Sequence, residues 1–184
     1  MRLALRAKTT ADVPCGTCQA CCTSGQFVHI EPDETDTLGR IPAELLFPAP
    51  GRPPGHVLLG YDADGRCPML GEAGCTIYEH RPRTCRTYDC RVLAAAGVVP
   101  DEPGKEAIAA RVVRWRWDKP SAELDAVRAA ARWLEGHGDE LPAPARPVTA
   151  TARAVLAFAL ADCFAGRDAP DPEEIRRRAG LLSP

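Results

Sequence analysis

Cysteine residues dominate the chemistry that this sequence could perform. Eight of the nine cysteines fall into two patterns, C-x2-C-x2-C-C and C-x7-C-x9-C-x4-C. Their positions are Cys15, Cys18, Cys21, Cys22, Cys67, Cys75, Cys85 and Cys90. Thiolates are soft ligands that select zinc, Cu(I) or iron–sulfur clusters over calcium and magnesium. Because the first residues lack the apolar core of an export signal, we expect reduced thiols and metal ligation, with a disulfide scaffold as the alternative.

The spacing of the first set narrows the choice of metal. A C-x2-C-x2-C run can place three thiolates around a bound group larger than a single ion. Ferredoxin-type iron–sulfur sites use such a run, and their remote fourth cysteine precedes a proline. Cys67-Pro68 supplies such a cysteine, whereas Cys22 cannot easily point at the same atom as its neighbour Cys21. The run favours an iron–sulfur cluster, with zinc as the alternative. Eight thiolates suffice for two zinc ions, two four-iron clusters, or one of each, and the spacing does not pair them.

Charged and aromatic residues accompany the second cysteine set. Its arginines are Arg81, Arg83, Arg86 and Arg91. A nearby guanidinium favours thiolate over thiol, so we expect these arginines to activate the cysteines, unless they form a solvated basic face. His80 is either a surface residue or a substitute ligand, and Tyr78 and Tyr88 are expected to pack over the metal site. Cys163 is expected to be a small buried apolar residue of a helix.

Short strands and tight turns should position the cysteines of this half. Phe27–Ile30 and Val57–Tyr61 each resemble a strand, and the acid-rich segment 31–34 resembles a helix start. Asp62–Gly65 contains the Asp-Gly turn signal, and Gly71 and Gly74 bracket a second turn. Such turns let several thiolates converge on one point.

The second half of the chain is expected to be mainly helical. Ser121 can cap a helix that ends at Glu135, before Gly136, and a second helix should run from Thr149 or Thr151 to Ala165. Asp171-Pro172 opens a final helix with a cap and a proline at the first helical position. The alternation in segment 114–117 is typical of a strand, although a helix end fits as well.

Apolar residues alone are too sparse to hold the cysteine-rich half together. Leu, Ile, Val and Phe make up only 13 of the 76 residues from 15 to 90. A structural zinc contributes about 10–16 kcal/mol of apparent binding free energy, whereas whole domains are stable by about 5–15 kcal/mol. We therefore expect an α+β fold in which a small, irregular, metal-stapled domain with short hairpins (residues 1–98) packs on a mainly helical extension (residues 99–184).

The cysteine-rich half resembles a known family over residues 15–91. The shared motifs are C-x2-C-x2-C-C, then C-P-x-L at Cys67–Leu70, then G-C-x-I-Y-x2-R-P-x2-C-R-x-Y-x-C at Gly74–Cys90. This long pattern is similar to the YkgJ-type CxxCxxCC family, described as a zinc- or iron-chelating domain. The resemblance implies that all eight cysteines are metal ligands. Flagellin lysine methylases carry a related domain, which implies protein modification as one alternative function.

Charge and hydropathy limit the partners that the chain could have. The formal net charge of −2 gives no general attraction to nucleic acid, and no stretch has the length of a membrane span. We expect a cytoplasmic metal-binding protein that serves in electron transfer or redox sensing. The alternatives are a structural zinc module that binds a protein partner, and an enzyme, although residues 100–184 contain no glycine-rich cofactor loop.

Overall fold

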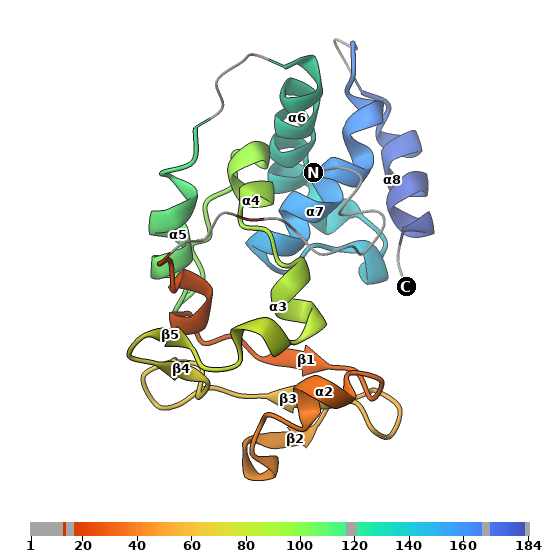
Figure 1. Ribbon diagram of the computed structural model, residues 1–184. Helices are drawn as coiled ribbons and strands as arrows, with labels where there is room; N and C mark the ends of the chain where they lie inside the picture. Colours follow the sequence, from red (N-terminus) through yellow and green to blue (C-terminus); the bar gives the residue numbers. More distant parts are fainter. Residues whose placement is uncertain (1–12, 14–16, 117–120, 167–169, 183–184) are drawn as a thin grey trace. The chain divides into compact units, whose positions relative to one another are not determined.

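The computed structural model describes residues 13, 17–116, 121–166 and 170–182 (Figure 1). Contacts divide the chain into an N-terminal unit, Met1–Asp89 with Pro103–Ile108, and a C-terminal unit, Cys90–Glu102 with Ala109–Pro184. Short antiparallel sheets in the first unit and packed helices in the second make the fold α+β, as predicted. The expected domain boundary after residue 98 stays a prediction.

A three-stranded antiparallel sheet forms the framework of the N-terminal unit. Its order is β1-β3-β2, with β1 at Val28–Ile30, β3 at Val57–Leu59 and β2 at Leu46–Pro48. Leu59 of the central strand pairs with Val28 on one side and Leu46 on the other. The two predicted strands are confirmed, and β2 adds the third.

Short helices and one small hairpin complete the N-terminal unit. The hairpin pairs β4 (Leu70–Gly71) with β5 (Gly74–Cys75), which confirms the second predicted turn. The helical segments are η1 (Ala20–Thr23), α2 (Thr35–Leu38), η2 (Ala43–Leu45), η3 (Tyr78–His80) and α3 (Arg83–Thr87). The acid-rich segment before α2 forms a turn, in which the Glu34 amide donates to the Glu31 carbonyl at 3.1 Å.

The predicted Asp-Gly turn has a clear physical cause. The Asp62 carboxylate accepts hydrogen bonds from the amides of Asp64, at 3.0 Å, and Arg66, at 2.8 Å. Gly65 adopts a φ of 74°, a left-handed conformation that costs residues with a β-carbon free energy. The turn therefore returns the chain toward Cys67.

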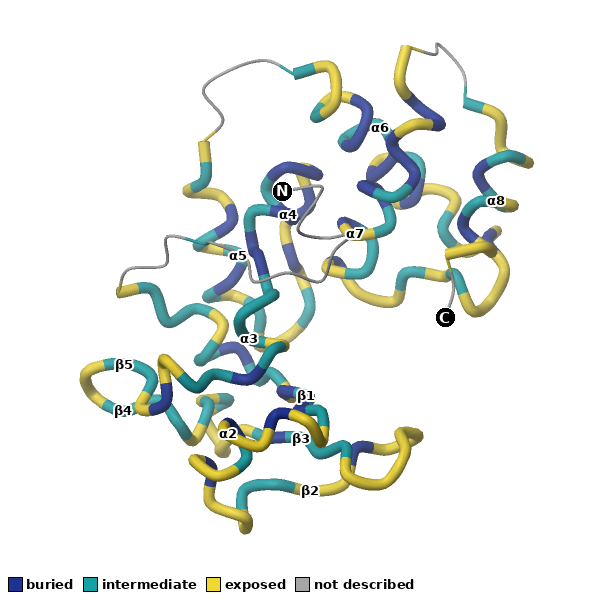
Figure 2. Tube along the Cα trace, turned by 45° about the vertical axis from the view of Figure 1, so that its right-hand side comes forward, coloured by how far each residue is buried: buried dark blue, intermediate teal, exposed yellow. Residues whose placement is uncertain are grey.

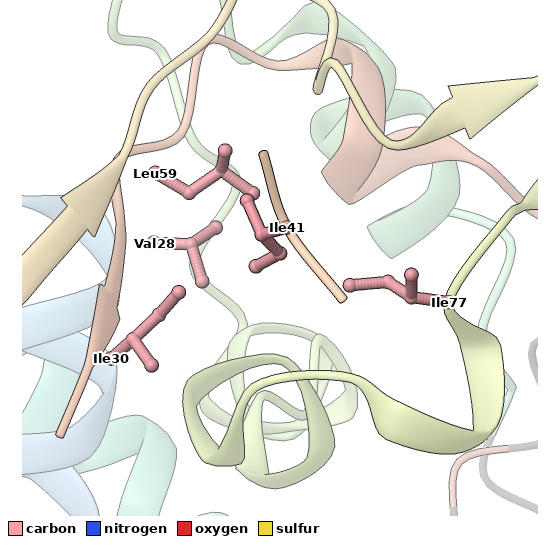
Figure 3. Packing of buried hydrophobic residues seen from close by; sticks show 5 residues of the cluster. All are labelled: Val28, Ile30, Ile41, Leu59 and Ile77. Atoms are coloured by element: carbon pink, nitrogen blue, oxygen red, sulfur yellow. The ribbon is translucent and has the colours of Figure 1, made fainter. Parts of the chain in front are cut away.

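The core of the N-terminal unit is small. Figure 3 shows its five buried residues, which are Val28, Ile30, Ile41, Leu59 and Ile77. Partly buried cysteines pack against this cluster, namely Cys67, Cys75 and Cys85. These three thiols, which are predicted metal ligands, thus lie at the boundary of the hydrophobic core.

Helices make up the C-terminal unit, and several of them pack together. Helix α6 contacts α4 and α7, and α7 contacts α8. Buried positions recur along these helices, including the fully buried Val127 of α6 and Leu160 of α7 (Figure 2). The elements are α4 (Arg91–Ala96), α6 (Ala122–His137), η4 (Gly138–Glu140), η5 (Ala143–Ala145), α7 (Ala150–Leu160), η6 (Ala161–Cys163) and α8 (Pro172–Leu181). A further helix, α5 (Glu106–Val112), contributes residues to both units.

The predicted helix caps of this unit are confirmed. The Ser121 hydroxyl accepts from the Leu124 amide, the Thr149 hydroxyl from the Ala152 amide at 3.1 Å, and the Asp171 carboxylate from the Glu173 amide at 2.9 Å. Helix α6 continues through Gly136 to His137, beyond the predicted end. The His137 ring stacks on Trp133, one turn earlier, with ring centroids 4.8 Å apart. This stacking holds the last turn.

Of the two predictions for segment 114–117, the strand is wrong and the helix end is confirmed for the described residues, because the amides of Arg114 and Trp115 donate to carbonyls of the last turn of α5. Trp117 lies outside the described residues.

Within the part of the chain that the structure describes, no helix combines the length and apolar character needed to cross a bilayer.

Candidate metal centre

Five partly buried cysteines of the N-terminal unit lie in or beside four short elements. Cys22 lies in η1, Cys75 ends β5 and Cys85 lies in α3, whereas Cys18 and Cys67 lie in the segments before η1 and β4. A backbone hydrogen bond of 2.7 Å joins the Cys67 amide to the Cys22 carbonyl. This bond ties the first cysteine set directly to the second.

Neighbouring thiols contribute to the raised pKa values of Cys22, Cys67 and Cys85. Burial, followed by the charges of Cys67, Cys75 and Cys18, raises the pKa of Cys22 to about 11. Burial, followed by Cys67, Cys22 and Cys75, raises the pKa of Cys85 to about 12. Residues that are distant in sequence thus form one group, which we call the thiol cluster: Cys18, Cys22, Cys67, Cys75 and Cys85.

Cys67 shows how burial prevails over a favourable hydrogen bond. The backbone hydrogen bond involving Met69 stabilises the Cys67 thiolate, but burial outweighs it and raises the pKa of this thiol. The charges of Cys75 and Asp62 push the pKa in the same direction. Without a bound metal ion, Cys22, Cys67 and Cys85 therefore hold their protons at neutral pH.

The sequence predicted that the arginines lower the pKa values of these cysteines. This prediction is wrong for Cys22 and Cys85, whose pKa values are raised. Arg81 lowers both pKa values, but its effect is smaller than that of burial. The Arg81 guanidinium lies 3.6 Å from the centre of the Tyr78 ring, and its Nε donates to the Tyr78 carbonyl at 2.7 Å.

Two further arginines of this segment, Arg83 and Arg86, pair with acidic residues instead. Arg83 pairs with Glu31 and with Asp33, the latter at 2.8 Å, and Arg86 lies 3.9 Å from the Glu34 carboxylate. These guanidiniums are committed to carboxylates of the segment before α2. The charge of Arg81, by contrast, acts on Cys22 and Cys85.

The chemistry of the thiol cluster fits zinc or iron. Both bind thiolate sulfur, and a bound ion supplies the positive charge that releases the thiol protons. Among the residues that the structure describes, no group of three or more His, Cys, Asp or Glu side chains is arranged to hold a metal ion. The fit therefore rests on the donor type, on the backbone hydrogen bond between Cys67 and Cys22, and on the effect of neighbouring thiols on the pKa values of Cys22 and Cys85.

The remaining predicted ligands differ in their burial and in the unit to which they belong. Cys21 is exposed, and Cys90 is a buried residue of the C-terminal unit at the start of α4. The Trp115 indole donates to the Cys90 sulfur at 3.3 Å. Cys15 lies outside the described residues. Ligation by all eight cysteines stays a prediction.

Other residues singled out from the sequence have defined positions. His80 contacts the Asp36 carboxylate and behaves as a surface histidine. Tyr78 is 48% exposed and carries the Arg81 guanidinium on its ring, and its packing over a metal site stays a prediction. Cys163 is fully buried in η6, as predicted.

Sequence reasoning missed a histidine pair in the N-terminal unit. Nε2 of His29 and Nδ1 of His56 are 3.0 Å apart, and their rings stack with an interplanar angle of 3°. The antiparallel pairing of β1 with β3 brings these residues together across 27 positions. No local signal in the sequence indicates such a pair.

Comparisons with known proteins give one match. A family model named CxxCxxCC, with the description "putative zinc- or iron-chelating domain", matches residues 14–107. No curated protein and no solved structure matches the chain significantly. The matched range contains every member of the thiol cluster.

Proposed function

Because the chain belongs to the CxxCxxCC family of zinc- or iron-chelating domains, we propose that it binds zinc or an iron–sulfur cluster through its clustered cysteine thiolates. The observation that carries the proposal is the link between the two cysteine sets: the Cys67 amide donates to the Cys22 carbonyl, and the charges of Cys67 and Cys75 act on both Cys22 and Cys85. Cys22, Cys67, Cys75 and Cys85 supply four sulfurs, which is the number that a tetrahedral zinc site or one iron–sulfur cluster uses. Cys15, Cys18, Cys21 and Cys90 are the further candidate ligands.

We assign the bound metal a structural role first. Five buried apolar residues form the core cluster of the N-terminal unit, and three cysteines of the thiol cluster pack against it. A small core rarely stabilises a domain alone, and natural small domains add disulfides or a metal. Metal loading would join η1, β5 and α3 at the edge of this core.

Electron transfer or redox sensing is the second candidate, and the Arg81–Tyr78 pair favours it. When an iron–sulfur cluster is bound, it supplies one-electron chemistry at a potential that local charge and exposure set. The Arg81 guanidinium is held on the Tyr78 ring within electrostatic range of Cys22 and Cys85. A fixed cation stabilises the more negative, reduced form, so Arg81→Gln should lower the midpoint potential.

Reconstitution under anaerobic conditions tests the proposal. The reduced, metal-free chain is titrated with Zn(II), and in a parallel experiment with Fe(II) and sulfide. We expect tight binding of one of these, with loss of binding in the variant Cys22→Ser/Cys67→Ser/Cys85→Ser. Cys163→Ala, which changes a buried cysteine outside the cluster, should keep the wild-type stoichiometry. Equal binding by the triple variant would rule out the cluster as the site.

A further inference from the structure

A buried carboxylate links the acid-rich segment before α2 to the helix that carries Cys85. The Glu34 side chain is 3% exposed. Its Oε1 accepts from the Glu31 amide at 2.9 Å, and its Oε2 accepts from the Arg83 amide. Burying a carboxylate costs free energy unless hydrogen bonds or charges compensate, so these contacts hold Glu34 in one place.

Arg83 is the first residue of α3, and its amide has no acceptor within the helix. The preceding residue, Pro82, provides no side-chain cap. Helix α3 spans only Arg83–Thr87, a length at which a helix is not stable by itself. Glu34 therefore replaces the missing cap from a segment 49 residues earlier in the chain.

A second contact fixes the same helix against the sheet. The Thr84 hydroxyl donates to the carbonyl of His29 in β1 at 2.6 Å. Figure 1 shows α3 beside β1. Together, Glu34 and Thr84 determine the rotation of α3, and Cys85 is the next residue along this helix.

The orientation of α3 determines where the Cys85 sulfur lies. Cys85 packs against the core cluster, and Cys67, Cys22 and Cys75 act on its charge. A turn of this short helix about its axis would move the sulfur away from these thiols. The ion pairs on the outer side of α3, such as Arg83 with Asp33, are exposed and contribute little.

We propose that Glu34 is a positioning residue that holds α3 so that Cys85 completes the metal centre. This inference rests on the proposed function, because the consequence of misplacing Cys85 is weaker metal binding. Residues that orient metal ligands without touching the metal typically change its affinity by roughly 10- to 100-fold.

The test is a double-mutant cycle that uses Co(II) as the probe. Glu34→Gln should weaken Co(II) binding by roughly tenfold or more and reduce the sulfur-to-cobalt charge-transfer absorption. In the Cys85→Ser background, Glu34→Gln should have no further effect on the affinity, because the ligand that it positions is gone. The matched control is Asp33→Asn, which removes an exposed partner of Arg83 and should change the affinity less than about twofold.

A milder variant covers the case in which Glu34→Gln does not fold. Thr84→Val removes the hydroxyl that donates to His29 and should weaken Co(II) binding in the same direction, again only when Cys85 is present. Equal weakening in the presence and absence of Cys85 would overturn the positioning role. Absence of Co(II) binding by the wild-type chain would instead contradict the proposed function itself.

Discussion

The indole N–H of Trp115 donates a hydrogen bond to the sulfur of Cys90, with 3.3 Å between the two atoms. Both residues belong to the C-terminal unit, and Cys90 is 7% exposed. The Arg111 guanidinium lies 4.6 Å from the centre of the Trp115 ring. The predicted ligand Cys90 thus accepts a hydrogen bond from the Trp115 indole. Such a bond stabilises negative charge on sulfur.

Trp115→Phe keeps an aromatic ring near Arg111 but removes the donor to Cys90. We expect the free energy of unfolding to fall by about 1 kcal/mol, because a typical hydrogen bond contributes about 0.5–1.5 kcal/mol. Urea unfolding followed by circular dichroism measures this loss. In the Cys90→Ala background the same substitution should cost little. An equal loss in both backgrounds would mean that packing of Trp115 matters and the bond to sulfur does not.

The affinity of the thiol cluster for metal should rise with pH. Burial raises the pKa of Cys22 to about 11 and that of Cys85 to about 12, so both thiols hold protons at neutral pH. Each proton that the metal displaces makes the affinity about tenfold stronger per pH unit, up to the pKa of the thiol. Zn(II) competition titrations from about pH 6 to about pH 8.5 measure this slope.

The same titrations have an internal control. Cys85→Ser should reduce the slope by about one proton, since one titrating thiol is lost from the cluster. Cys163→Ala should leave the slope unchanged, because Cys163 is fully buried in η6 and is not a predicted ligand. A pH-independent affinity for the wild-type chain would show that the ligating groups are already ionised at neutral pH, against the direction of these pKa shifts.

Two neighbouring threonines distinguish the cap of α7 from its first turn. The Thr149 hydroxyl accepts from the Ala152 amide, whereas Thr151 is an exposed residue inside the helix. Thr149→Ala should therefore cost about 1 kcal/mol of stability. Thr151→Ala should be neutral or slightly stabilising, because alanine has the higher helix propensity. Thermal unfolding of the two variants makes the comparison, and equal melting temperatures would contradict the assignment of the cap.

The sequence correctly predicted the helix caps and turns that form through hydrogen bonds between residues close together in the chain. Ser121, Thr149 and Asp171 each cap a helix within three residues, and the Asp62–Gly65 turn closes on its own carboxylate. The strand expected around Trp115 was wrong, because alternation of residue types does not supply a partner strand. There the chain instead completes the last turn of α5.

The features that sequence reasoning missed depend on contacts between distant segments. Glu34 was interpreted as an acid in a helix start, yet its carboxylate binds the amide of Arg83. The arginines beside Cys85 were expected to ionise it, but Arg83 is bound by carboxylates from the segment before α2. Whether an arginine faces a thiol or an acid depends on the tertiary structure, so cysteine spacing predicted the donor type better than the ionisation state.

Metal and acid-labile sulfide analysis of protein purified without oxygen tests the central claim most directly. We expect at least one zinc ion per chain without sulfide, or iron with matching sulfide, together with protection of the cluster thiols from alkylation. Either metal should be lost when Cys22, Cys67 and Cys85 are replaced by serine. A chain that contains neither metal, and whose cluster thiols all remain open to alkylation after incubation with Zn(II) or with Fe(II) and sulfide, would contradict it.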